Sequence, residues 1–163
     1  MKKDTLVVYF SCGGTTEWAG KTLAGILGCG SYPLEAQESY TKEDLDWRNP
    51  DSRSSLEMKD EGARPAYKKL PVDLEDYGRI FIGFPIWWDI EPRIIDHFLE
   101  EEDLKGKEVV PFATSGGSPI DKAQDRLEEK YGPGLKILRG QRLNRSLEKE
   151  DVEAWIQDLN PEK

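Results

Sequence analysis

Five short apolar runs, most of them followed by a segment with helical spacing of apolar residues, constrain the fold of this chain most strongly. A short, almost continuous apolar run is typical of a strand that is covered on both faces. Alternating strands and helices predict an α/β protein: a doubly wound, five-stranded parallel sheet in a three-layer αβα sandwich, with right-handed crossovers. The predicted strands are residues 5–10, 31–36, 79–84, 108–113 and 136–143, and the predicted helices are residues 16–27, 92–100, 121–131 and 147–159.

Residues 37–76 interrupt this alternation with a polar, charged stretch that contains several prolines. The stretch holds too few apolar residues for a core of its own, so we expect one domain over residues 1–163 with a long excursion at about 37–76. Inside the excursion, Thr41 and Asp44 resemble the start of a helix, and residues 52–59 predict a short helix.

Composition excludes several classes of function. The net charge of −9 disfavours binding to nucleic acid or to an anionic membrane surface and favours basic protein partners. No apolar run approaches the roughly 20 residues that cross a bilayer, so we expect no membrane insertion. The two cysteines, Cys12 and Cys29, lack metal-ligand spacing and suit a reduced compartment, which predicts a cytoplasmic protein. A single histidine, His97, argues against a metal site.

The segment after the first predicted strand is rich in small and hydroxyl-bearing residues. At the start of a helix, unpaired N–H groups and the helix dipole favour an anion, and serine and threonine hydroxyls can donate to a phosphate. The same residues suit an ordinary turn in which Thr15 or Thr16 caps the helix, and this segment alone does not separate the two interpretations. The candidate ligand-binding residues here are Ser11, Cys12, Gly13, Gly14, Thr15 and Thr16.

Residue spacing rules out the better-known phosphate chemistries. Gly20, Lys21 and Thr22 match the end of a nucleoside-triphosphate loop, but no glycine stands five residues before Gly20. A thiol phosphatase needs an arginine six residues after Cys12, where Trp18 stands. A dinucleotide loop G-x-G-x-x-G is absent as well. The remaining possibility is a single phosphate held by neutral donors.

A second candidate segment follows the third predicted strand. Pro85 ends the strand, and two consecutive tryptophans then fall in a loop. Flat aromatic side chains at this position can form a wall for a flat ligand. The alternative is that both indoles pack beneath the 37–76 excursion. The candidate residues are Pro85, Ile86, Trp87 and Trp88.

A third candidate segment follows the fourth predicted strand and is again rich in glycine and hydroxyl groups. By itself it suits an ordinary strand-to-helix turn. The carboxyl ends of parallel strands share one edge of a sheet, however, so all three segments are expected to meet there. A ligand with one phosphate and a wide planar ring matches this set, and flavin mononucleotide (FMN) is the obvious candidate. The residues are Thr114, Ser115, Gly116, Gly117 and Ser118.

Over nearly its whole length the chain resembles the flavodoxin-like family. The pattern Ser11-x-x-Gly14-x-Thr16 looks like the phosphate loop of that family, and residues 83–88 and 111–118 look like its two ring-contacting loops. The resemblance implies strand order 2-1-3-4-5, with FMN between strands one and three. Gly13 stands where the family usually has Thr or Ser, and Thr15 stands where Asn is usual.

Two functions remain open from the sequence, together with a module that has lost its flavin. The first is an electron carrier that binds FMN and exchanges electrons with partner proteins, a reductase and an acceptor. The alternative is an FMN-dependent NAD(P)H:quinone-type reductase. Asp89 and Glu91 follow the tryptophans and are candidates for tuning the flavin by their charge. Cys12, beside a helix N-terminus, is either a reactive thiol with a lowered pKa or a small loop residue whose N–H faces the phosphate, and we favour the second interpretation.

Overall fold

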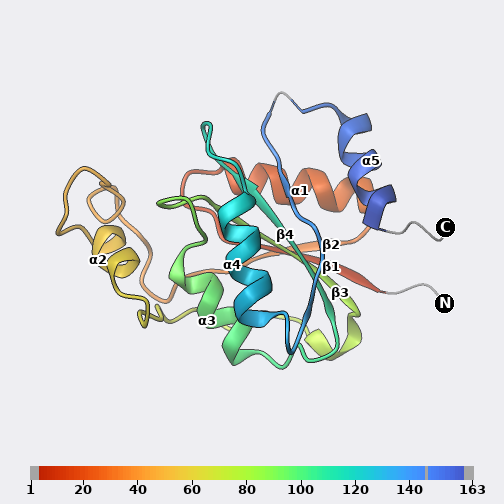
Figure 1. The fold of residues 1–163 in the computed structure, drawn as a ribbon, viewed down its shortest axis with the longest axis horizontal. Helices are drawn as coiled ribbons and strands as arrows, with labels where there is room; N and C mark the ends of the chain where they lie inside the picture. Colours follow the sequence, from red (N-terminus) through yellow and green to blue (C-terminus); the bar gives the residue numbers. More distant parts are fainter. Residues whose placement is uncertain (1–3, 146, 160–163) are drawn as a thin grey trace.

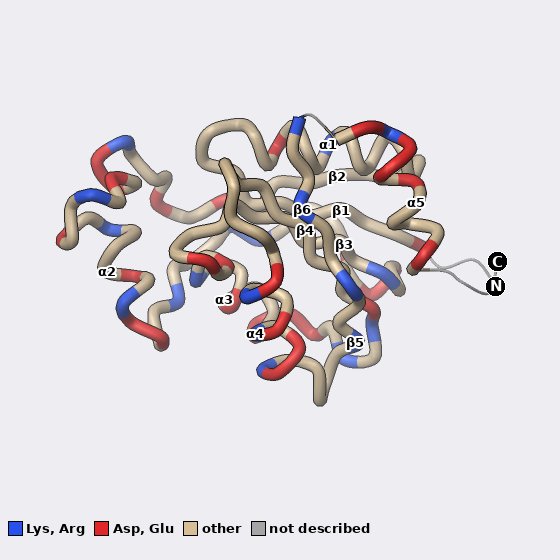
Figure 2. Tube along the Cα trace, turned by 45° about the horizontal axis from the view of Figure 1, so that its top comes forward, with Lys and Arg blue, Asp and Glu red and all other residues tan. Residues whose placement is uncertain are grey.

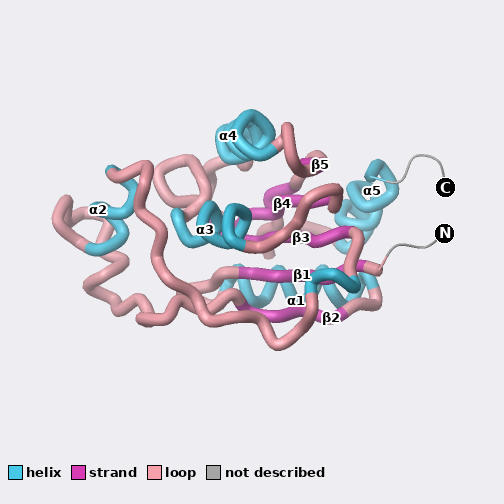
Figure 3. The backbone as a smooth tube through the Cα atoms, turned by 90° about the horizontal axis from the view of Figure 1, so that it is seen from below, coloured by secondary structure: helices cyan, strands magenta, loops and turns pink. Residues whose placement is uncertain are grey.

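A parallel sheet forms the centre of the molecule, in a computed structural model that describes residues 4–145 and 147–159. Figure 1 shows the course of the chain through the strands and helices. The strands lie in the order β2-β1-β3-β4-β5 (Figure 3), and all pairs are parallel. The predicted fold class and strand order are therefore confirmed. The four longer strands are β1 (Thr5–Tyr9), β2 (Gly30–Pro33), β3 (Arg79–Pro85) and β4 (Glu108–Thr114).

Helices cover both faces of the sheet (Figure 3). Alternate β1 residues face opposite layers, so Val7 packs with α1 (Thr15–Leu27) and α5 (Lys149–Leu159), whereas Val8 belongs to the core formed with α3 (Arg93–Glu101) and α4 (Asp121–Tyr131). Both valines are fully buried. This three-layer arrangement explains why the strands read as almost continuous apolar runs.

The outermost position of the sheet departs from the sequence-based expectation of one continuous strand over residues 136–143. Two short strands occupy it instead, β5 (Lys136–Ile137) and β6 (Gln141–Arg142), and both pair with β4. The interruption lies beside Pro111, which has no N–H to donate to a ladder. The N–H of Gly140 turns to Gln124 Oε1, at 2.8 Å. A side chain at Gly140 would collide with the Pro111 carbonyl, because its Cβ would lie 2.1 Å from that oxygen.

The excursion contains the predicted short helix, α2 (Arg53–Lys59), and a 3₁₀ turn at Leu74–Asp76. Thr41 and Asp44 exchange the expected reciprocal hydrogen bonds, but they close a turn and no helix follows. The second strand also ends earlier than predicted, at Pro33, because Ala36 pairs antiparallel with Tyr67 of the excursion.

Polar contacts fasten the excursion to α3. The guanidinium of Arg64 donates to both carboxylate oxygens of Glu100, at 2.8 and 2.9 Å. Arg93 is buried and donates to the carbonyl of Met58, at 3.0 Å, so the end of α2 is held by the first turn of α3. The excursion is thus attached to both the first and the last turn of α3. Across the described residues, no helix combines the length and apolar character needed to cross a bilayer.

A cluster of buried charges lies between α3 and α4. Glu91 and Asp96 are both fully buried, and Arg126 approaches them with its Nε 3.3 Å from Glu91 and its Nη2 3.7 Å from Asp96. The hydroxyl of Tyr131 donates to Asp96 Oδ1, at 2.7 Å, and Arg93 lies 3.8 Å from Asp96 Oδ2. Burial, together with the like charge of Asp96, raises the pKa of Glu91 from 4.5 to about 8.

We expect this raised pKa to make the folded protein less stable as the pH rises from about 4.5 to about 8. In that window the native Glu91 stays protonated while the unfolded one ionises, so the native state binds more protons and the free energy of unfolding falls with pH. Glu91→Gln cannot ionise. Its melting temperature relative to the wild type should therefore increase between pH 5 and pH 8.5, as measured by thermal unfolding at several pH values.

Glu129→Gln, at an exposed position of α4, is the matched control and should show no such pH-dependent difference. A difference between wild type and Glu91→Gln that stays constant across this pH range would contradict the assignment.

Candidate functional site

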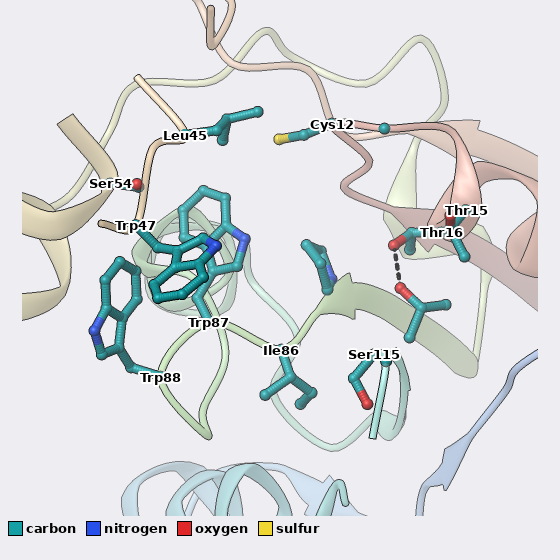
Figure 4. Close-up of a pocket in the computed structure, with 14 residues that line it drawn as sticks. Cys12, Thr15, Thr16, Leu45, Trp47, Ser54, Ile86, Trp87, Trp88 and Ser115 are labelled. Atoms are coloured by element: carbon teal, nitrogen blue, oxygen red, sulfur yellow. Dashed lines mark hydrogen bonds between the residues drawn. The ribbon is translucent and has the colours of Figure 1, made fainter. Parts of the chain in front are cut away.

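The loops after β1, β3 and β4 meet at the carboxyl edge of the sheet and enclose a cavity of about 690 Å³ (Figure 4). This volume lies within the range of about 300–1,000 Å³ that is typical of small-molecule sites. The candidate residues that line the cavity are Cys12, Gly13, Thr15, Thr16, Pro85, Ile86, Trp87, Trp88, Thr114, Ser115 and Gly116. The excursion contributes three further lining residues, Leu45, Trp47 and Ser54.

The first loop is shaped by its own backbone. The N-cap of α1 is Gly14, whose φ of 91° is left-handed, and no side chain caps the helix. The alternative in which Thr15 or Thr16 caps α1 is therefore wrong, and the first N–H groups of the helix remain available to a ligand. Ser11 supports the turn, because its Oγ accepts a hydrogen bond from the N–H of Gly14, at 3.1 Å. Neither Ser11 nor Gly14 is among the residues that line the cavity.

The two threonines at the start of α1 have different surroundings. Thr16 is buried, and its hydroxyl lies 2.7 Å from the hydroxyl of Thr114 at the end of β4. This hydrogen bond joins the first loop to the third across the floor of the cavity (Figure 4). Thr15 is exposed, and its side chain makes no hydrogen bond with the described residues. The Thr15 hydroxyl is therefore free to donate to a ligand.

The sequence offered two interpretations of Trp87 and Trp88: a wall for a flat ligand, or packing beneath the excursion. The structure gives a different answer for each tryptophan. Trp87 packs edge-on against Phe10 and Tyr40, with ring centroids 5.8 and 5.5 Å apart, and Tyr40 belongs to the excursion. Trp88, in contrast, is 48% exposed. Packing beneath the excursion therefore describes Trp87 in part and does not describe Trp88.

Trp88 is held outward by a tight turn. The backbone N–H groups of Trp87 and Ile90 each donate to the other residue's carbonyl, at 2.9 and 3.1 Å. Trp88 and Asp89 between them have φ values of 48° and 72°. A turn with positive φ at both central residues favours the sequence Asn-Gly. Trp88 and Asp89 occupy these two positions instead, so each residue carries backbone strain of about 1–3 kcal/mol.

The third loop places one more polar residue and an open stretch of backbone at the cavity. The hydroxyl of Ser115 donates to the carbonyl of Ser118, which closes the turn. Gly117 and Ser118 themselves do not line the cavity. A Cβ added at Gly13 or Gly116 would meet no atom within 4 Å, so the peptide groups there are open to a ligand.

The excursion supplies a feature that the sequence patterns did not reveal. Ser54 is 2% exposed, lines the cavity, and its hydroxyl has no hydrogen-bond partner. A buried hydroxyl without a partner is costly, so a bound ligand is the natural source of the missing bond. Trp47 is 69% exposed and stands near Ser54 in Figure 4. The one signal for this part of the site was Trp47 itself, a large aromatic residue in a polar stretch.

The structure does not support the roles that the sequence suggested for Cys12, Asp89 and Glu91. The sulfur of Cys12 points into the cavity (Figure 4), and desolvation raises the pKa of this thiol to about 12, so the idea of a lowered pKa is wrong. Asp89 is exposed and lies 3.6 Å from the ammonium of Lys122. The carboxyl group of Glu91 is buried against Arg126. Neither acid lines the cavity, which disfavours a direct role in tuning a ligand.

The donors and aromatic rings lie at opposite ends of the cavity. Thr15, Thr16 and Ser115 occupy one end in Figure 4, and the tryptophans occupy the other. The donor end suits a phosphate, because it combines a free hydroxyl with the N-terminus of α1. The aromatic end suits a flat ring with polar atoms at its edge, because the unpartnered hydroxyl of Ser54 lies there. FMN has both parts, and these residues fit it.

Solved structures resemble this chain closely. A candidate flavoprotein from Bacteroides eggerthii is 46% identical, with a TM-score of 0.92, over 97% of this chain and 98% of that one. A second, from Bacteroides uniformis, is 44% identical, with a TM-score of 0.89, over 96% and 99%. A flavoprotein from Lactobacillus acidophilus, solved in complex with FMN, shares the fold at 21% identity and a TM-score of 0.74, over 95% and 99%. The search of curated proteins found no match.

The family comparison agrees with the topology and with the position of the cavity. The family model described as Flavodoxin matches residues 4–159, which is nearly the whole chain. With a parallel sheet of order 2-1-3-4-5 and a cavity at the carboxyl edge beside β1 and β3, the chain belongs to the flavodoxin family.

Proposed function

We propose that this protein binds FMN and serves as a cytoplasmic electron carrier between partner proteins. The observation that carries the proposal is a single cavity with phosphate donors at one end and tryptophans at the other. The FMN complex of the Lactobacillus acidophilus flavoprotein, which shares the fold, supports the choice of ligand.

Each part of the cavity has a task in this proposal. The N-terminus of α1 and the Thr15 hydroxyl hold the phosphate, while Trp87, kept in place by Phe10 and Tyr40, forms a wall for the ring. The hydroxyl of Ser54 donates to a polar atom of the ligand and so gains the partner that it lacks. FMN, when bound, supplies one- and two-electron transfer chemistry, and the protein supplies position and surroundings.

The surface charge favours protein partners that are basic. The chain carries 32 acidic and 23 basic residues, and Figure 2 shows acidic positions on α3, α4 and α5. An excess of negative charge speeds the encounter with positively charged proteins, and this effect weakens as salt is added. Trp88 is exposed at the cavity, where it offers an apolar contact to a docked partner.

The alternative function, an FMN-dependent NAD(P)H:quinone-type reductase, draws on one observation. A second cavity, of about 440 Å³, shares Trp47 and Trp88 with the first one. A reductase needs room for a small-molecule substrate beside the flavin, and this second cavity offers such room. An NADPH-quinone reductase from P. pentosaceus shares the fold at 15% identity, which shows the fold alone.

Thr15→Val tests the phosphate end of the cavity. The variant should bind FMN about tenfold more weakly, because it loses a hydrogen bond to a charged group. The stability of the FMN-free protein should stay within about 0.5 kcal/mol of the wild type, because this hydroxyl has no partner in the described chain. Quenching of flavin fluorescence measures the affinity, and urea unfolding measures the stability.

Riboflavin, which lacks the phosphate, is the matched ligand and should bind wild type and Thr15→Val equally well. Thr22→Val, at an exposed position on α1, is the matched variant and should leave FMN affinity unchanged. Equal weakening of FMN and riboflavin by Thr15→Val would show that the phosphate lies elsewhere.

A kinetic measurement separates the two functions. As an electron carrier, the FMN-loaded protein should oxidise NADH or NADPH, with a quinone present, no faster than free FMN at the same concentration. Electrons delivered by a separate flavodoxin reductase should pass through it to a basic acceptor such as cytochrome c, at a rate that falls with ionic strength. Rapid NAD(P)H oxidation that saturates with substrate would favour the reductase.

A further inference from the structure

A second cavity, of about 440 Å³, lies beside the first one, between the excursion and the turn after β3. Trp47 and Trp88 line both cavities, so they stand where the two meet. The volume of the second cavity is again in the range of small-molecule sites. Its lining residues are Trp47, Arg48, Pro50, Ser55, Met58, Lys59, Trp88 and Ile90.

The walls of this second cavity are aromatic surfaces left in contact with water. Trp47 is 69% exposed and Trp88 is 48% exposed, and together with Leu56 they are the exposed large apolar side chains of the described residues. The positive φ of Trp88 and Asp89 keeps the Trp88 indole outward in spite of the strain. Strained backbone clusters at functional sites, and neighbouring exposed aromatic rings are typical of a binding surface. Trp88 has both features, and Trp47 beside it has the second.

The charge of this second cavity is opposite to that of the protein as a whole. The chain has a net charge of −9, yet Arg48 and Lys59 line the cavity and no acidic residue does. Within the described residues, neither cation forms an ion pair. The guanidinium of Arg48 stands over the ring of Trp47, at 5.4 Å from its centroid. The ammonium of Lys59 donates to the carbonyl of Pro50, at 2.9 Å, and keeps two further protons for another acceptor.

We propose that the second cavity is a separate ligand site for a planar aromatic anion. The ring of the ligand lies against Trp47 and Trp88, and its acidic group lies near Arg48 and Lys59. Because the tryptophans also line the flavin cavity, the ligand is held next to the isoalloxazine ring. The class of ligand is thus an aromatic carboxylate, sulfonate or phosphate. This site goes beyond FMN binding, although the placement of the ligand next to the flavin rests on the proposed function.

The test is a calorimetric titration of the FMN-loaded protein with 2-naphthalenesulfonate, since bound FMN blocks the first cavity. The anion should bind saturably. Methanesulfonate, which has no ring, and the (2-naphthylmethyl)trimethylammonium cation, which reverses the charge, should each bind at least about tenfold more weakly. Equal binding of the naphthyl anion and the naphthyl cation, or the absence of any saturable binding of the anion, would overturn the proposal.

The double variant Arg48→Gln with Lys59→Gln locates the site. It should weaken binding of the anion about tenfold and leave the affinity for FMN unchanged, because neither residue lines the first cavity. Lys105→Gln, at an exposed position between α3 and β4, removes a similar charge elsewhere and should have no effect. Unchanged anion binding in the double variant would refute the assignment.

Failure of this site and failure of the FMN site give different results. If the protein does not bind FMN, the same titration is made on the FMN-free protein. Sensitivity to the Arg48 and Lys59 double variant then still supports the second site, and insensitivity overturns it, whatever the outcome for the flavin.

Discussion

In the middle of the sheet, β1, β3 and β4 run parallel, and most of their side chains are withdrawn from water on both faces. Burial of this ladder aligns the ends of the three strands, because a parallel register leaves all carboxyl ends at one edge. The loops that follow the three strands begin at this edge and therefore lie next to one another. The position of the cavity is therefore a consequence of the core, and the loops determine only its chemistry.

Two kinds of contact turn that meeting point into a defined cavity. The hydroxyls of Thr16 and Thr114 join the first and third loops across 98 residues of sequence. Arg93 ties the end of α2 to α3, which keeps Ser54 of α2 at the cavity, and Arg64 fastens a later part of the excursion to the last turn of α3. The excursion is polar and has few apolar contacts within itself. It can form one wall of the cavity because its contacts with α3 hold it in place.

The sequence predicted the layers and the strand order well because each depends on local pattern. Apolar runs and helical spacing report burial on the two faces of the sheet, and Gly28 ends α1 in the left-handed conformation that favours glycine. The prediction was less accurate where the extent of a strand depends on the partner strand with which it pairs. Residues 136–143 read as one strand, but their ladder depends on Pro111 in another strand, which no local pattern records.

The sequence by itself determined the sheet, its covering helices and the three loops at the cavity, because these follow from the periodicity of apolar residues and from turn chemistry. Only the tertiary structure decided which side chains act together. It buried Thr16 against Thr114, left the Thr15 hydroxyl free, buried Glu91 between two helices and brought Trp47 beside Trp88. The physical reason is that burial, strain and the pairing of polar groups arise between residues far apart in the chain, and a local pattern carries no information about them.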